Sequence, residues 1–147
     1  MHIRTVSITV AAAHDAVFHF LADLENLPRW ATEFCERLEL RQGAWWAYTS
    51  QGELLVEADV SAGAGTIDLR LGPAPGRLTP FPLRVVPVGA RRTLVTFTLI
   101  QPEGQPDEHY ETHYRSLLLE LRGLIRRFGG GELHAFEPTP LAAPGWN

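Results

Sequence analysis

The sequence predicts an α+β fold in which a curved antiparallel sheet of about seven strands surrounds a long C-terminal helix, with two short helices after the first strand. Two patterns predict it. In the middle of the chain, short runs of alternating apolar and polar residues are divided by glycine-containing turns, as in an antiparallel meander. Near the C-terminus, apolar residues recur at helical spacing over 106–128. Because a straight helix cannot follow a curved sheet along its whole length, a cavity is expected between them.

The elements follow one another in a simple order. The first strand is expected over residues 2–10, where apolar residues occupy every second position. Two short helices are expected over 13–23 and 24–34, and Trp30 would anchor the second of them to the core. The meander strands are then expected over 36–42, 44–50, 53–61, 65–71, 80–88 and 92–100.

The long helix sets the domain boundary. Acidic residues stand in its first turn and arginines in its last, which suits the helix dipole, and three glycines at 129–131 end it. One ligand-binding domain is therefore assigned to residues 1–128, a usual size for a single core. Residues 129–147 are rich in Gly and Pro and are expected to form an irregular or disordered tail.

Composition excludes several classes of partner and chemistry. The net charge is −4 with no basic run, which argues against nucleic acid, and no apolar run approaches the roughly 20 residues that span a bilayer. The first ten residues alternate like a strand and carry no signal-peptide pattern, and the single cysteine, Cys35, fits a cytoplasmic protein. The sequence contains no lysine, which excludes a Schiff base and the phosphate-binding GxxxxGK[ST] loop.

The motif DEHYETHY, residues 107–114, opens the long helix and contains the most distinctive polar residues. His109 and His113 are four apart and share a helix face, but the sequence signals no third ligand, so neither a metal nor a cofactor is predicted. One interpretation is a solvated first turn. The other places His113, with Tyr110 and Tyr114, at one end of the cavity, where His113 or Tyr114 could transfer protons.

Asp68 and Arg84 form a second candidate pair. If the connection between their strands folds symmetrically about Gly76, the two residues lie opposite each other and form a cross-strand ion pair. The alternation of apolar residues favours the outer face and a structural role. On the inner face, Arg84 would instead be a catalytic candidate or a fixed donor for a ligand oxygen.

Large aromatic residues are the third group of candidates, because they could line a pocket or fill a core. Trp45 and Trp46 are adjacent on a strand, so one of them must project outward and could mark a partner surface. The residues expected to contact a ligand are Trp30, Trp46, Tyr48, Phe81, Phe97, His109, Tyr110, His113 and Leu117.

Several phrases of the sequence resemble a known superfamily. They are ITVAAAHDAVFHFLADLENLPRWATEF over 8–34, GTIDLRL over 65–71, PLRVVPVG over 82–89 and TFTLIQPEGQPDEHYE over 96–111. These segments are similar to the START-like superfamily, also called SRPBCC, and to its bacterial polyketide cyclase/dehydrase-like branch. The resemblance implies a helix-grip fold over roughly residues 1–128. It implies less about function, because that superfamily hosts transport, cyclisation, oxygenation and chaperone-activating roles.

Three functions stay open on the sequence alone. The first is binding of a hydrophobic or aromatic small molecule, polyketide-like or lipid-like, in the cavity beneath the long helix. The second is an aromatase/cyclase or dehydratase that acts on a poly-β-ketone chain with cavity His, Tyr or Arg groups. The third is a non-catalytic module that self-associates as a homodimer through an outward tryptophan and the tail residues Phe136 and Trp146.

Overall fold

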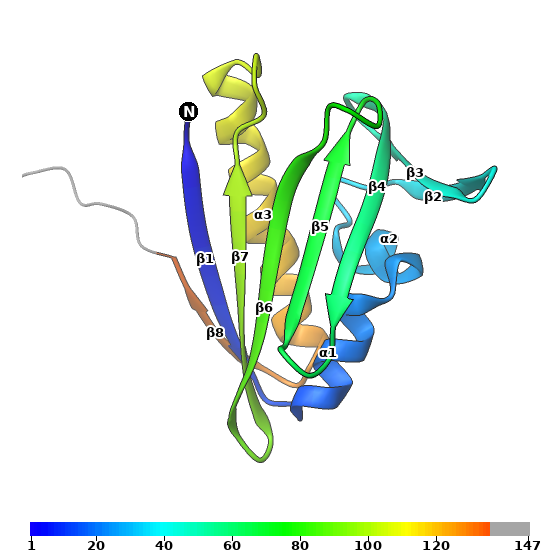
Figure 1. Ribbon diagram of the computed structural model, residues 1–147. Coiled ribbons are helices and arrows are strands. Elements are labelled where there is room, and N and C mark those ends of the chain that lie inside the picture. Colours follow the sequence, from blue (N-terminus) through cyan, green and yellow to red (C-terminus); the bar gives the residue numbers. More distant parts are fainter. Residues whose placement is uncertain (136–147) are drawn as a thin grey trace, which may run out of the picture.

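The computed structural model describes residues 1–135, which form a curved antiparallel sheet with one long helix across it (Figure 1). The sheet has eight strands in the order β2-β3-β4-β5-β6-β7-β1-β8. Its strands are β1 (Ile3–Val10), β2 (Arg37–Arg41), β3 (Ala44–Thr49), β4 (Gly52–Ser61), β5 (Thr66–Gly72), β6 (Thr79–Gly89), β7 (Arg92–Ile100) and β8 (Gly131–His134). Its helices are α1 (His14–Ala22), a 3₁₀ turn (Leu24–Asn26), α2 (Leu27–Trp30) and α3 (Asp107–Arg127).

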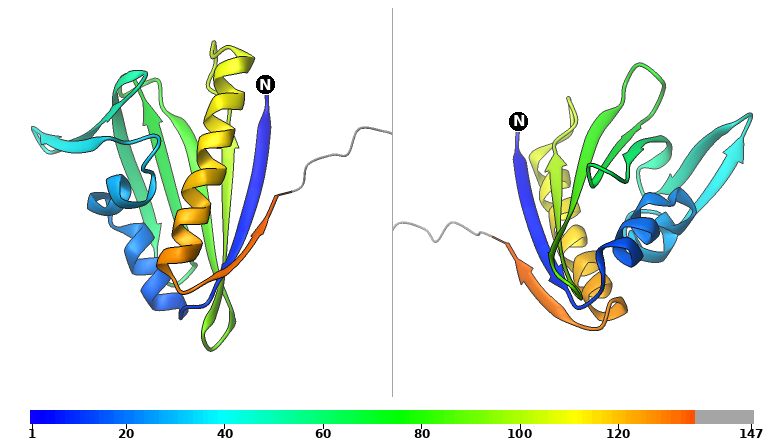
Figure 2. Two further views of the ribbon diagram at one scale, coloured as in Figure 1. Left: turned by 180° about the vertical axis from the view of Figure 1, so that it is seen from behind. Right: turned by 60° about the horizontal axis from the view of Figure 1, so that its bottom comes forward.

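The sequence predicted the meander from β2 to β7 correctly, and β1 closes it by pairing with β7. Figure 2 shows α3 lying across the concave side of the sheet, with α1 and α2 beside its C-terminal half. Val6, Ile8 and Val10 of β1 are buried against the same core as Leu121 and Leu124 of α3. Every second residue of a strand points towards α3, and these residues form one core with the apolar stripe of that helix.

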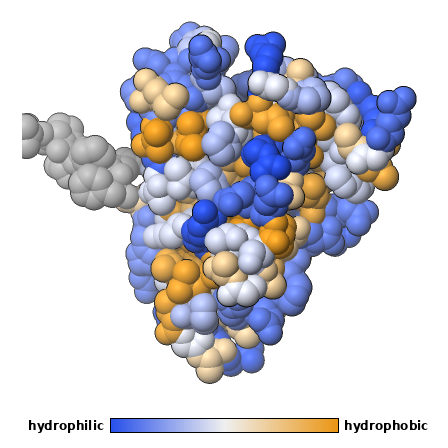
Figure 3. All heavy atoms as spheres, in the orientation of Figure 1, coloured by the Kyte–Doolittle hydropathy of each residue, from blue (hydrophilic) through white to orange (hydrophobic). Residues whose placement is uncertain are grey.

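The opposite face of the sheet is the outer one. Figure 3 shows polar side chains running across its middle between separate hydrophobic patches. Arg70 forms ion pairs there with Asp59 and Glu57, at 2.7 and 3.5 Å. This alternation of an apolar inner face with a mixed outer face explains the period of two in the sequence.

Asp68 and Arg84 form the expected ion pair on this outer face, with 2.8 Å between Arg84 Nη1 and Asp68 Oδ1. The expected register was wrong, because Arg84 lies opposite Thr66 and Asp68 opposite Pro82. The turn is centred one residue earlier than Gly76, which makes the pair diagonal, and the long arginine side chain spans the diagonal. About 44% of the Arg84 side chain is exposed, and it points away from α3.

The C-terminal tail differs from the prediction at its start. Residues 131–134, expected to be irregular, form β8 and pair antiparallel with β1, from Ser7↔His134 to Val10↔Gly131. The three glycines that end α3 all have positive φ, which lets the chain reverse and reach the sheet edge. Phe136 and Trp146 lie outside the described residues.

Gly72 shapes the opening of the cavity described below. A Cβ at this position would lie 1.8 Å from the carbonyl oxygen of Arg77, so only glycine lets the β5–β6 loop fold back on the strand end. That loop, with Leu78 at its inner side, forms part of the cavity lining.

Candidate functional site

A cavity of about 1160 Å³ lies between the concave face of the sheet, α2 and α3. Its polar lining comes mainly from α3 and the loop before it, whereas the sheet supplies apolar side chains. Apolar residues of the lining include Leu27, Trp30, Phe34, Leu54, Leu69, Leu71, Phe81, Leu99 and Leu117. A large apolar chamber with a few polar groups is the usual form of a small-molecule site.

The DEHYETHY motif is divided between two faces of α3. His109 and His113 line the cavity, as the sequence predicted, with His109 at the exposed rim. Tyr110 and Tyr114 turn about 100° away, towards β1 and β7, so the expectation that they reach the cavity was wrong. The hydroxyl of Tyr110 donates to the Leu99 carbonyl at 2.7 Å, and only 1% of this residue is exposed.

Arg4 holds the tyrosine side of the helix to β1. Its two terminal nitrogens donate to the carboxylate of Glu111 at 2.8 and 2.6 Å, and its guanidinium lies 4.5 Å from the ring centre of Tyr114. The Arg4 guanidinium lowers the pKa of Glu111 below its usual range. This bidentate pair fixes the rotation of α3 and thereby keeps the histidines on the cavity side.

His113 is held between two glutamine side chains. Its Nε2 lies 2.8 Å from Gln51 Nε2 and its Nδ1 lies 3.4 Å from Gln105 Nε2. Burial, and then the nearby His109, lower the pKa of His113, which favours the neutral ring at neutral pH. A neutral ring has one N–H and one acceptor nitrogen, so it can accept a hydrogen bond from one of these two amide nitrogens.

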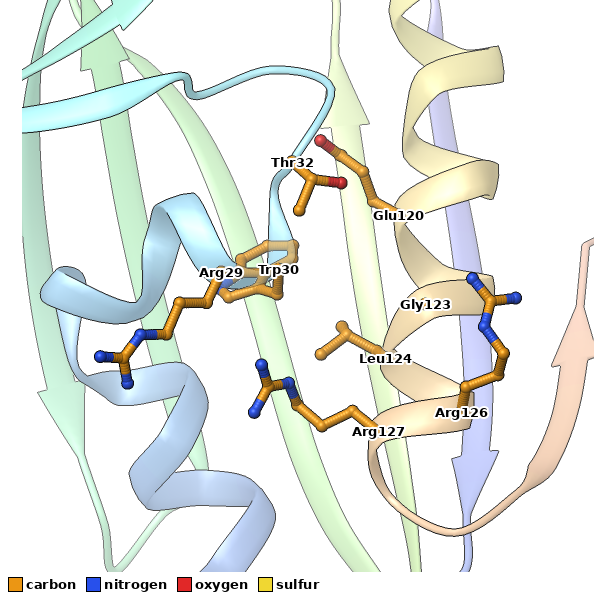
Figure 4. A pocket seen from close by; sticks show the side chains of 8 residues that line it. All are labelled: Arg29, Trp30, Thr32, Glu120, Gly123, Leu124, Arg126 and Arg127. Carbon is orange, nitrogen blue, oxygen red and sulfur yellow. The ribbon is translucent and has the colours of Figure 1, made fainter.

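Glu120 is a titratable cavity residue that the sequence did not lead us to expect. Its Oε2 accepts hydrogen bonds from the backbone N–H groups of Glu33 and Phe34, at 2.9 and 3.0 Å, and 5% of the residue is exposed. Figure 4 shows its side chain extending from α3 towards the α2–β2 linker near Thr32. The sequence does contain a signal for this position. Glu120 follows Leu117 by three residues and precedes Leu124 by four, which places it on the apolar face of the helix.

The protonation of Glu120 is set by its surroundings. Burial raises its pKa to about 7, the two backbone N–H donors oppose this effect, and the charge of Glu33 adds to it. A carboxyl group that titrates near neutral pH inside a cavity can serve as a proton donor or acceptor.

The predicted aromatic lining is only partly correct. Trp30 and Phe81 line the cavity, whereas Phe97 is fully buried behind both, with ring centres 5.8 and 6.4 Å away. Trp46 and Tyr48 point to the outer face, because the inner positions of β3 are taken by Trp45 and Ala47.

Outer-face arginines cover these two aromatic rings. Arg41 lies 5.1 Å from the ring centre of Trp46, and Arg37 lies 3.9 Å from that of Tyr48. The hydroxyl of Tyr48 donates to Glu39 at 2.8 Å. The expectation that Trp46 and Tyr48 line the cavity was therefore wrong, and Arg84 likewise lies on the face away from the cavity.

Residues 1–135 contain neither a metal-ion cluster nor a membrane-spanning helix. No group of three or more His, Cys, Asp or Glu side chains is arranged to hold a metal ion in this part of the chain. None of its helices has the length and apolar character needed to cross a membrane.

Comparison with known proteins identifies the fold. No family model matches the sequence, and no curated protein matches it. Among solved structures, the protein XoxI from Bacillus cereus superposes with a TM-score of 0.68 at 17% identity, covering 87% of this chain and 96% of that one. A START superfamily protein from Mycobacterium smegmatis gives 0.61 at 16% identity, covering 86% and 99%. This protein has the START-like, helix-grip fold.

The same START-like fold occurs in an enzyme. The Zhui aromatase/cyclase from Streptomyces sp. R1128 superposes with a TM-score of 0.61 at 20% identity, covering 88% of this chain and 99% of that one. At such identities the similarity establishes the architecture, so the chemistry of this START-like chain must be argued from its own residues.

Proposed function

We propose that this protein binds a hydrophobic or aromatic small molecule, polyketide-like or lipid-like, in the cavity between the sheet and α3. The observation that carries this proposal is the cavity itself, about 1160 Å³ with a largely apolar wall. Drug-sized ligands commonly occupy chambers of roughly 300–1,000 Å³, so the space suits one such molecule.

The distribution of polar groups supports a ligand with an apolar body and few polar atoms. Leu69, Leu71 and Phe81 present the sheet wall, and these side chains offer no hydrogen bond. His113 stands on the first turns of α3 and Glu120 more than three turns from its start, so α3 supplies polar groups along the length of the cavity. A ligand would bury its body against the sheet and direct polar atoms towards α3.

Native mass spectrometry tests this function directly. The purified protein is measured before and after organic extraction, and the extracted material is identified. We expect a co-purifying hydrophobic molecule, or uptake of the neutral fluorescent probe N-phenyl-1-naphthylamine by the extracted protein. Protein that carries no such molecule and also fails to bind the probe would contradict the proposal.

A substitution inside the cavity sharpens the test. Ser116 lines the cavity from α3, and Ser116→Trp is expected to weaken N-phenyl-1-naphthylamine binding roughly tenfold or more by occupying its space. The matched control is Leu119→Trp, on the same helix but 57% exposed, which should bind the probe as the wild type does. Equal loss in both variants would indicate a damaged helix and not a blocked cavity.

Catalysis is the second candidate, and the buried carboxyl of Glu120 favours it. An aromatase/cyclase or dehydratase must move protons on a bound poly-β-ketone, and Glu120 and His113 are titratable groups at the cavity wall. If this proposal is correct, the protein converts a thioester-linked poly-β-ketone, and Glu120→Gln lowers kcat by about 10²-fold or more while binding persists. Retention of full turnover in Glu120→Gln would exclude that role.

A further inference from the structure

A second, smaller cleft lies beside the main cavity, at the C-terminal half of α3 (Figure 4). Its volume is about 540 Å³, and α2 and α3 form its two sides. Trp30 and Glu120 line both this cleft and the main cavity, so the two spaces adjoin at these two side chains. Arginines dominate its remaining polar lining, with Arg29 on α2 and Arg126 and Arg127 on α3.

The two arginines on opposite sides of the cleft are held by neutral partners. Arg29 Nη1 donates to the Asn26 side-chain oxygen at 3.1 Å. The guanidinium of Arg127 lies 4.5 Å from the ring centre of Phe20 on α1, and Figure 4 shows this side chain reaching from α3 towards α1 and α2. Neutral partners restrain these side chains without cancelling their charge.

These arginines differ from most of those on the sheet. Within residues 1–135, no Asp or Glu side chain forms an ion pair with Arg29, Arg126 or Arg127, whereas Arg70 and Arg84 each have such a partner. Arginines in the last turn of a helix also interact favourably with its dipole, which explains Arg126 and Arg127. Arg29 stands in the last turn of α2, a helix of only four residues, and adds its charge to the same cleft from the other side.

We propose that this cleft holds the acidic group of an amphipathic ligand, a carboxylate, sulfonate or phosphate attached to the hydrophobic or aromatic body in the main cavity. The inference rests on the proposed binding function and names the class of ligand. Guanidinium groups are suited to bind oxyanions, Arg29 and Arg127 stand on the two sides of the cleft, and the hydroxyl of Thr32 is a further donor in the lining. Gly123 has no side chain, which leaves room for the ligand beside α3.

A pair of fluorescent probes separates the acidic group from the body. 1-Anilinonaphthalene-8-sulfonate carries a sulfonate, and N-phenyl-1-naphthylamine has the same aromatic body without it. In the double variant Arg29→Gln/Arg127→Gln, we expect affinity for the sulfonate probe to fall about fivefold to tenfold, as for two exposed charge contacts, with the neutral probe unchanged. Added salt should weaken sulfonate binding in the wild type and much less in the double variant.

Two control variants complete the experiment. Arg122→Gln removes the same charge from an exposed position of α3 that lines neither space, and it should bind both probes as the wild type does. Arg29→Lys/Arg127→Lys keeps the charges and should recover most of the sulfonate affinity. Methanesulfonate, which lacks an aromatic body, should displace neither probe at concentrations where the sulfonate probe binds.

The binding results separate failure of the acidic-group site from failure of the apolar cavity as a binding site. Unchanged sulfonate affinity in the glutamine double variant, or an equal loss with Arg122→Gln, would overturn the cleft as an acidic-group site. Displacement of the sulfonate probe by methanesulfonate would overturn the amphipathic ligand in favour of a free anion. If the neutral probe fails to bind while sulfonate binding still depends on Arg29 and Arg127, the anion site stands and the apolar cavity function fails.

Discussion

Phe97→Ala is expected to lower the free energy of unfolding by about 3–5 kcal/mol, the usual cost of removing a buried phenylalanine. Phe97 is 0% exposed and stands behind both Trp30 and Phe81, the two aromatic rings of the cavity wall. Its loss leaves a void that those rings must fill or border. The measurement is urea-induced unfolding, followed by tryptophan fluorescence.

The same variant should also change ligand binding, because Trp30 and Phe81 lose their support. Weaker N-phenyl-1-naphthylamine binding in the folded variant is the expected result. Leu119→Ala, at an exposed position of α3, is the control and should change stability by less than about 0.5 kcal/mol. A cost for Phe97→Ala below about 1 kcal/mol would contradict the packing described for this core.

Glu120→Gln is expected to stabilise the protein by up to about 3 kcal/mol at alkaline pH. In the folded state, burial raises the pKa of Glu120 from 4.5 to about 7, and this displacement corresponds to about 3 kcal/mol. Glutamine is neutral and can still accept the backbone hydrogen bonds from Glu33 and Phe34 through its side-chain oxygen. The variant therefore avoids the cost of burying a charge.

The direction of the pH dependence follows from the different pKa of Glu120 in the folded and the unfolded protein. Between 4.5 and about 7 the folded protein keeps a proton on Glu120 that the unfolded chain has lost. Stability from this group is therefore fully present below 4.5 and is lost as the pH rises through 7. The wild type should lose stability over this window relative to Glu120→Gln.

Urea unfolding of both proteins at about pH 4 and about pH 8 measures the difference. The matched control, Glu36→Gln, removes an exposed carboxylate near the same linker and should follow the wild type. Parallel pH curves for the wild type and Glu120→Gln would show that Glu120 is not a buried titrating group.

The sequence alone determined the order and type of the elements from β1 to α3. Period-two alternation, glycine turns and the helical stripe of 106–128 correspond to β2–β7 and α3 within one or two residues at most boundaries. These patterns arise from local geometry and from burial of one face, and both are encoded along the chain. The resemblance to START-like proteins was likewise carried by local segments, and the fold confirms it.

The sequence also contained part of the site. His109, His113 and Leu117 follow from helical spacing, and Trp30 from its position on the second short helix; all four line the cavity. The alternation of Leu83 and Val85 correctly placed Arg84 on the other face of the sheet. Here the period of the pattern decided the direction of each side chain.

Tertiary structure alone decided the rest. Trp45 and Trp46 alternate equally well in either direction, so only the packing of β3 on the core could turn Trp46 outward. The Asp68–Arg84 register depended on the shape of the β5–β6 loop, and β8 formed because the sheet edge at β1 offered a partner. Arg29 and Arg127 line one cleft only because α2 and α3 pack side by side. The same packing brings Glu120 to the backbone of the α2–β2 linker. Contacts between segments so distant in sequence depend on the relative placement of whole elements, which no local pattern encodes.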